Sequence, residues 1–228
     1  MIKRALEAGL MEMAVTNPRD FTKSRHRQVD DTIYGGGAGM LMMCQPLFDA
    51  CHHVLPEKGK RDRVIFLSPA GETFTQDKAK ELYRDYDHLV LICGHYEGVD
   101  HRVEEHLADE LISIGDYVLT GGELGAMVIS DAVARMVPGV LGDAGSAATD
   151  SFYEPILEYP QYTKPYDYNG WKVPDVLLSG HHANIARWRR KEALRRTLHH
   201  RPDLFGKLIL SGEDKKLMAE IREEEKEE

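Results

Sequence analysis

The stretches RVIFL (Arg63–Leu67) and HLVLI (His88–Ile92) decide the fold. Both are short and mainly apolar, as strands buried in a parallel sheet are. Between them, Thr75–Arg84 is helical in character, with Thr75 or Asp77 near its start. A strand, a helix and a strand in this order predict an α/β domain built on a parallel sheet.

The neighbouring stretches continue this alternation of helices and strands. The sequence predicts helices over Ile2–Ala8, Val99–Ala108 and Glu123–Val137, and a strand over Glu110–Ile114. The last of these helices ends before Pro138-Gly139, a pair that rarely continues a helix.

The character of the chain changes after Gly142. Asp143–Trp171 has many small residues, Pro and Tyr and no clear period, whereas the pattern from Ala183 onward is helical with a break at Pro202. Long irregular segments are usually functional or act as linkers. We therefore expect an α/β domain at 1–141, a connecting segment at 142–157 and a small helical domain at 158–228.

The composition excludes several classes of protein. The chain has 228 residues, of which 42% are apolar and 29% charged, as in an ordinary globular protein. No apolar run approaches the roughly 20 residues that span a bilayer, and the N-terminus lacks the apolar core of a signal peptide. We therefore expect a cytoplasmic protein with no membrane partner. The three cysteines contain no Cys-x-x-Cys pair, which argues against a disulfide framework.

Charge is unevenly distributed along the chain. The net charge of -9 argues against indiscriminate binding to nucleic acid, yet Arg187–Arg201 contains seven Arg or Lys residues, two His and one Glu. This run is either a solvated helix face or a local basic face that holds a phosphate backbone.

The densest glycine cluster is YGGGAGM (Tyr34–Met40). It is not a dinucleotide fingerprint, because Met40 stands at the third glycine position, and no Gly-Lys-Ser/Thr follows to make a P-loop. Such a loop either approaches a ligand with its backbone N–H groups or is simply flexible.

Two more glycine-bearing turns follow predicted strands. CGHYEGVD (Cys93–Asp100) follows the second apolar run, and IGDYVLTGGE (Ile114–Glu123) opens a predicted helix. Ligands of open α/β sheets gather beyond the carboxyl ends of the strands, and a glycine pair before a helix can bind an anion or a purine edge. Each turn alone could be an ordinary connection, but together they predict a nucleotide-like ligand at one sheet edge.

Several polar residues are ambiguous when each is taken alone. Arg135 could be a surface charge at a helix end, and Asp150 could be a helix N-cap. The histidine pairs at 52–53, 181–182 and 199–200 match no metal-site spacing, so we expect them to be structural or exposed.

Taken in order, these motifs resemble the bacterial tRNA (guanine-N1)-methyltransferases. That family modifies guanosine at position 37 of tRNA and belongs to the SPOUT superfamily of knotted methyltransferases. The resemblance covers nearly the whole chain. The matching stretches are Pro18–Met42, Leu67–Gly71, Cys93–Asp100, Ser113–Met127, Arg135–Gly142, Asp150–Phe152 and Val173–Arg190.

The resemblance implies a fold, a cofactor and an assembly. The fold is an α/β domain whose parallel sheet carries a deep trefoil knot, followed by a small helical C-terminal domain that helps to hold tRNA. The assembly is an obligate homodimer whose active site forms between two subunits. S-adenosylmethionine would lie bent in the knot. The residues that the resemblance gives to this cofactor are Leu67, Ser68, Pro69, Gly94, Tyr96, Glu97, Gly98, Ile114, Tyr117, Leu119, Gly121 and Gly122.

The resemblance also implies roles in the reaction. N1 of guanine carries a proton at neutral pH, so a base must remove it, and a fixed cation can stabilise the charge that spreads onto O6. The family gives the base to Asp150 and the cation to Arg135, and Glu97 resembles a group near the methyl donor and the target base. Family members are similar in needing Mg²⁺ for turnover, although no metal ligand is assigned. The residues expected to contact tRNA are Gly36, Gly37, Ser146, Arg187 and Arg190.

Two features depart from the family pattern. Family members begin with an apolar strand and a Phe-Pro-Glu segment, whereas Met1 falls where the next helix should already be under way, which predicts a sheet lacking its first strand. His95 stands where the family often has Arg, and this exchanges a permanent charge for a titratable one.

The sequence therefore predicts methylation of N1 of guanosine 37 in tRNA from S-adenosylmethionine. The alternatives are another SPOUT RNA methyltransferase and a catalytically silent RNA-binding module. A phosphate-binding hydrolase built on the Gly35–Gly39 loop would lack the P-loop lysine and a plausible set of metal ligands.

Overall fold

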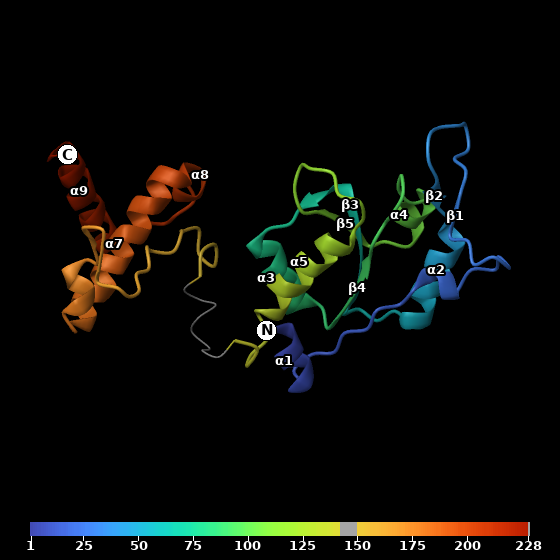
Figure 1. The fold of residues 1–228 in the computed structure, drawn as a ribbon, viewed down its shortest axis with the longest axis horizontal. Helices are drawn as coiled ribbons and strands as arrows, with labels where there is room; N and C mark the ends of the chain where they lie inside the picture. Colours follow the sequence, from blue (N-terminus) through green and yellow to red (C-terminus); the bar gives the residue numbers. More distant parts are fainter. Residues whose placement is uncertain (142–149, 228) are drawn as a thin grey trace. The chain divides into compact units, whose positions relative to one another are not determined.

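The structure of the protein is a computed structural model that describes residues 1–141 and 150–227. The chain divides into two compact units, Met1–Ala144 and Gly145–Glu228. Figure 1 shows a sheet with helices around it in the first unit, and mainly helices in the second.

A parallel sheet forms the centre of the first unit. Its strands β3 (Asp62–Thr73), β4 (His88–Ile92) and β5 (Glu110–Ser113) lie in the order β4-β3-β5, and both pairings are parallel (Figure 1). This confirms the α/β class and the parallel sheet that the sequence predicts.

Strand β3 is longer than the apolar run that predicts it. It leaves the ladder with β5 after Leu67 and resumes at Glu72, so the residues between them form a bulge. Pro69 lies in this bulge, where a residue without an N–H sacrifices no ladder hydrogen bond. Gly71 passes so close to β5 that a Cβ atom there would lie 2.4 Å from a backbone nitrogen of that strand.

Helices cover both faces of the sheet. Alternate residues of β3 point to opposite sides, so the strand contributes side chains to a buried cluster on each face. On one face, Ile65 packs with buried residues of α3 (Gln76–Asp85) and α5 (Glu123–Ala134). On the other face, Val64 and Phe66 pack against α2 (Cys44–Val54) and α4 (Arg102–His106).

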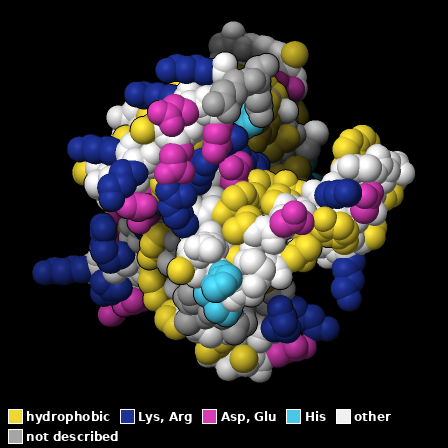
Figure 2. Space-filling view, turned by 90° about the vertical axis from the view of Figure 1, so that its left-hand side faces the viewer, with side chains coloured by type: hydrophobic (Ala, Val, Ile, Leu, Met, Phe, Trp, Pro, Cys, Tyr) yellow, Lys and Arg dark blue, Asp and Glu magenta, His cyan; other side chains and the backbone are white. Residues whose placement is uncertain are grey.

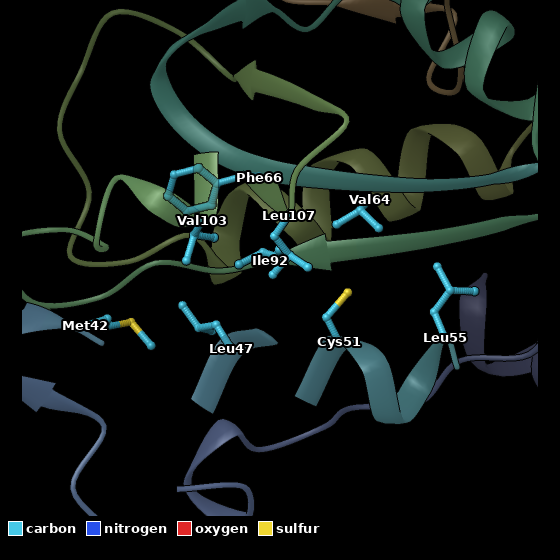
Figure 3. Packing of buried hydrophobic residues seen from close by; sticks show 9 residues of the cluster. All are labelled: Met42, Leu47, Cys51, Leu55, Val64, Phe66, Ile92, Val103 and Leu107. Carbon is cyan, nitrogen blue, oxygen red and sulfur yellow. The ribbon is translucent and has the colours of Figure 1, made fainter. Parts of the chain in front are cut away.

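Figure 3 shows the cluster between the sheet and α2 from close by. Its members come from both layers: Met42, Leu47, Cys51, Leu55, Val64, Phe66, Ile92, Val103 and Leu107. Fully burying one large aliphatic side chain is worth roughly 1.5–3 kcal/mol. This cluster therefore holds α2 and α4 against the sheet.

The helix boundaries follow local capping. The Thr75 side chain accepts a hydrogen bond from the Lys78 N–H at 3.3 Å, so Thr75 is the N-cap of α3 and the helix begins at Gln76. Helix α4 begins only at Arg102, later than the sequence predicts, because the Asp100 carboxylate accepts the Arg102 N–H at 3.0 Å. Helix α5 ends at Ala134, before the predicted end at Val137.

The segment before the sheet is mostly irregular. It contains α1 (Ile2–Glu7), a 3-10 turn η1 (Pro18–Asp20), and a short antiparallel pair of β1 (Asp30–Asp31) with β2 (Leu41–Met42). The glycine-rich loop connects β1 to β2, and its residues 34–39 are exposed.

The second unit is built on the long helix α7 (His182–His200). After it come α8 (Pro202–Phe205) and α9 (Gly212–Glu227), and before it a short hairpin of β6 (Asp167–Tyr168) with β7 (Trp171–Lys172) and a 3-10 turn η2 (Asp175–Leu178). The sequence pattern does not predict this hairpin, because the stretch before Trp171 has no clear period. The buried core of the unit consists of Ile156, Ala193, Leu194, Leu217, Met218 and Ile221.

Hydrogen bonds tie the first segment of the second unit to α7. Thr197 is fully buried, and its Oγ1 accepts the Leu157 N–H at 2.9 Å while donating to the Ala193 carbonyl at 2.6 Å. Nearer to Asp150, the Ser151 hydroxyl accepts the Glu158 N–H at 2.8 Å. The chain from Asp150 to Glu158 is thus folded onto α7.

Within the described ranges, no helix has the length and apolar character needed to cross a membrane.

Candidate active site

Three turns at the carboxyl edge of the sheet enclose one cavity of about 420 Å³. They are the bulge of β3, the loop after β4 and the loop between β5 and α5. Because the three strands are parallel, their carboxyl ends meet at this edge. Glycine-bearing turns at one sheet edge are the arrangement that the sequence predicts for a nucleotide-like ligand.

The structure brings together every residue that the sequence analysis gave to a cofactor. All of them line this cavity: Leu67, Ser68, Pro69, Gly94, Tyr96, Glu97, Gly98, Ile114, Tyr117, Leu119, Gly121 and Gly122.

Glycines allow the loops after β4 and β5 to touch. The Gly122 N–H donates to the Gly94 carbonyl at 2.9 Å, and a Cβ atom at Gly122 would lie 2.8 Å from the Cα atom of Cys93. Real Cβ atoms do not approach backbone so closely, so only glycine fits there. This contact joins two walls of the cavity.

The loop after β4 is also held by the N-terminal segment. The Arg19 guanidinium donates to the Tyr96 hydroxyl at 2.7 Å, and Tyr96 has a left-handed backbone with φ 59°. The Glu97 N–H donates to the Met40 carbonyl at 3.1 Å, and the Glu97 side chain occupies the space next to Gly39. The glycine-rich loop is thus anchored beside the cavity, although Gly36 and Gly37 do not line it.

The charged side chains that line the cavity are mainly acidic. They are Glu97 and Glu104, and no Lys or Arg is among the lining residues. His95 is exposed at the same loop, with its Nδ1 3.9 Å from Oε1 of Glu123. The cavity is therefore electrostatically suited to a ligand that carries a positive centre.

Cys93 precedes this loop but is unsuited to act as a nucleophile. Burial first, and then the nearby Glu123 carboxylate, raise the pKa of the Cys93 thiol to about 11. The thiol is therefore protonated at neutral pH, and only the thiolate is a strong nucleophile.

Sequence analysis did not give Glu104 a role, although it lines the cavity from α4. No sequence signal separates it from the neighbouring acid Glu105, because only the direction of the helix decides which of them faces the cavity. His95 was noted as a departure from the family pattern and also lines the cavity.

The expected catalytic residues fall in different units. Arg135 is the C-cap residue of α5 in the first unit, where it is half-buried. Asp150 is half-buried and belongs to the second unit. Ser146, which we expect to contact tRNA, lies outside the described residues.

The two arginines expected to contact tRNA are engaged in ion pairs. The Arg187 guanidinium pairs with Glu220, and its Nε is 3.6 Å from Oε1 of Glu213. Arg190 donates two hydrogen bonds to the buried Asp214, at 2.8 and 3.0 Å.

No metal ligands can be assigned. Over 1–141 and 150–227, no group of three or more His, Cys, Asp or Glu side chains is arranged to hold a metal ion.

The fold and the cavity define an α/β protein with a cavity at the carboxyl edge of a parallel sheet, where open α/β sheets bind their ligands. Comparison with known families makes this more specific. The family model described as tRNA (Guanine-1)-methyltransferase TrmD matches residues 1–207. The chain belongs to the tRNA (Guanine-1)-methyltransferase family, whose fold is the SPOUT fold.

Curated relatives agree with this assignment. The chain is 53% identical over 225 residues to a tRNA (guanine-N(1)-)-methyltransferase of Halalkalibacterium halodurans. The aligned residues cover 99% of this chain and 91% of that relative. Relatives with the same name in Desulforamulus reducens and Brevibacillus brevis are each 55% identical, over 97% and 99% of this chain and 87% and 92% of their own lengths.

Proposed function

We propose that this protein transfers a methyl group from S-adenosylmethionine to N1 of guanosine 37 in tRNA. The observation that carries the proposal is the cavity at the carboxyl edge of the sheet, in a chain whose relatives are named tRNA (guanine-N(1)-)-methyltransferases. Methylation of N1 blocks Watson–Crick pairing of that base, so the modification would protect the reading frame.

The residues around the cavity fit S-adenosylmethionine. A volume of about 420 Å³ suits a ligand of this size, and Glu97 and Glu104 favour a cation, with no lining Lys or Arg to oppose it. The glycine-bearing turns allow close approach of backbone groups to adenine and ribose. When bound, S-adenosylmethionine supplies a methyl group that is already electrophilic because its sulfur is positively charged.

Asp150 and Arg135 would perform the proton and charge chemistry. The Asp150 carboxylate would accept the proton from N1 of guanine. N1 could then take the methyl group as its bond to the cofactor sulfur breaks, leaving S-adenosylhomocysteine. The Arg135 guanidinium stabilises the negative charge that spreads onto O6. Each role is worth roughly 10²-fold or more in rate.

We infer further that the chain forms a knot in the α/β domain and that two copies of the protein share each active site. The contact between Gly94 and Gly122 supports a close crossing of the loops after β4 and β5. An exposed apolar hollow of about 440 Å³ on and beside α5 supports a partner copy, since large exposed apolar patches mark interaction sites. The residues that line this hollow are Ile114, Tyr117, Leu119, Leu124, Met127 and Val128.

The parts of the chain would then divide the work. Residues 1–141 bind the cofactor, 142–157 supply the base, and 158–228 hold tRNA, with Gly36, Gly37 and Ser146 contacting the RNA from the other parts. A tRNA substrate would place the activity in the cytoplasm.

The decisive experiment is methyl transfer from labelled S-adenosylmethionine to a tRNA transcript with guanosines at positions 36 and 37. A matched transcript with adenosine at position 37 is the control. We expect label on the first transcript only. Equal label on both transcripts would place the target elsewhere, as in another SPOUT methyltransferase.

A calorimetric titration with S-adenosylmethionine accompanies this assay. No label together with no cofactor binding would favour the silent RNA-binding module and overturn the proposal.

A further inference from the structure

The basic side chains of α7 fall into two groups that the sequence does not separate. Arg187, Lys191 and Arg195 form ion pairs with acidic residues of α9, among them Glu220 and Glu224. Hydrogen bonds from Arg187 lower the pKa of Glu220, and those from Lys191 lower the pKa of Glu224. These cations are neutralised by their partners and are occupied within the second unit.

Arg189 and Arg196 form the other group. Both are exposed, and among the described residues neither has an ion-pair partner within 4.0 Å. They are seven residues apart, so a helix of 3.6 residues per turn puts them within about 20° of each other and about 10 Å apart along its axis. The same geometry turns them about 100° or more away from Arg190, Lys191 and Arg195.

Arg189 is also oriented by an aromatic ring. Its guanidinium carbon lies 4.8 Å from the centroid of the Tyr159 ring, in a cation–π contact. Stacking uses the face of the guanidinium and leaves its N–H edge available, and this edge matches two oxygens of a phosphate.

The side of α7 that pairs with α9 could not bind an RNA backbone in the same way, because carboxylates of α9 already engage its cations. Figure 2 shows Lys and Arg side chains interleaved with Asp and Glu on the face that it presents. A phosphate that approaches the paired arginines would also come close to the carboxylates of α9, and these negative charges would repel it.

We propose that tRNA is held by the side of α7 that carries Arg189 and Arg196, each of which binds a backbone phosphate. Arg187 and Arg190 instead hold the helices of the second unit together. This inference rests on the proposed function, and it moves the expected RNA contacts on α7 from Arg187 and Arg190 to Arg189 and Arg196.

The test measures the affinity for the guanosine-37 transcript over a range of salt concentrations. Each phosphate contact contributes roughly 0.7–0.9 to the slope of log K against log [salt]. We expect Arg189→Gln and Arg196→Gln each to lower that slope by about one contact and to weaken binding severalfold. Arg196→Lys should restore the slope because it keeps the charge.

Arg195→Gln is the matched control, because it removes the same charge from the adjacent position on the paired side. We expect it to leave the slope unchanged. Equal loss of slope in Arg195→Gln and Arg196→Gln, or an unchanged slope in both Arg189→Gln and Arg196→Gln, would overturn the inference.

Methyl transfer by the unaltered protein is measured on the same transcript. If the unaltered protein methylates guanosine 37 while the slopes do not change, the inference alone fails. If it neither binds nor methylates the transcript, the proposed function fails as well.

Discussion

Asp150 is the residue on which the proposed chemistry depends. We expect Asp150→Ala to lower methyl transfer by roughly 10²-fold or more, because nothing then removes the N1 proton. Cofactor binding should be nearly unchanged, since Asp150 does not line the cavity. Single-turnover methyl transfer and calorimetry with S-adenosylmethionine measure the two effects. Near-normal turnover in this variant would remove Asp150 from the role of base.

A second residue-scale effect concerns acid stability. Asp214 is 3% exposed, and hydrogen bonds from Arg190, and secondarily from Ser211, lower its pKa from 3.8 to about 2 despite the opposing effect of burial. A carboxylate with a lowered pKa stabilises the fold above its unfolded pKa, and this stability is lost as the pH falls from about 4 to about 2. The loss should be at most about 2 kcal/mol.

Tryptophan fluorescence during urea unfolding measures this effect at several pH values. The only tryptophans of the chain, Trp171 and Trp188, both lie in the second unit. Arg190→Gln should lower stability at neutral pH and flatten its dependence on pH between 4 and 2. An equally steep dependence in that variant would show that another group titrates.

At the scale of elements, the contact between two loops builds the cavity. We expect Gly122→Ala to separate the loops after β4 and β5, because its Cβ atom would meet the Cys93 backbone at 2.8 Å. Affinity for S-adenosylmethionine should fall at least tenfold, as measured by calorimetry. Gly212→Ala is the control, since a Cβ atom there meets nothing within 4 Å. Equal affinities in the two variants would contradict this role for the contact.

The elements also show what could be predicted from sequence. The apolar run His88–Ile92 coincides with β4, because its residues pack alternately against the clusters on the two faces of the sheet, so both faces of the strand are apolar. The continuation of β3 past its bulge was missed, because Ser68 and Pro69 interrupt the apolar pattern. The late start of α4 goes with a hydrogen bond from the Arg102 N–H to the Asp100 side chain, which competes with the helical pattern.

Two kinds of sequence information pointed to the cavity, one to its place in the fold and the other to its individual residues. The glycine turns after the strands indicated a ligand edge, whereas the individual residues came from the family resemblance. The pairing of α7 with α9 could not be predicted, because Arg195 and Arg196 look alike in sequence and differ only in the side of the helix they occupy.

At the scale of the whole molecule, the exposed apolar hollow on α5 bears on assembly. Met127 is 65% exposed there, next to Leu124 and Val128. If two copies meet at this hollow, as proposed, Met127→Lys should shift the protein toward monomer in sedimentation velocity, because the interface would bury a lysine without a partner. Methyl transfer should fall with it if the site is shared. A Lys substitution at the exposed Ile209 of the second unit is the control. A Met127→Lys protein that sediments like the unaltered one would argue against an interface at α5.

The hydrogen bonds of Ser151 and Thr197 have a kinetic consequence. They fasten the segment that follows Asp150 to α7, so the proposed base and the proposed RNA-binding residues Arg189 and Arg196 belong to the same compact unit. Under the proposed function, RNA held on α7 therefore engages the same unit that supplies the base. This shared unit would link the consumption of S-adenosylmethionine to the presence of tRNA.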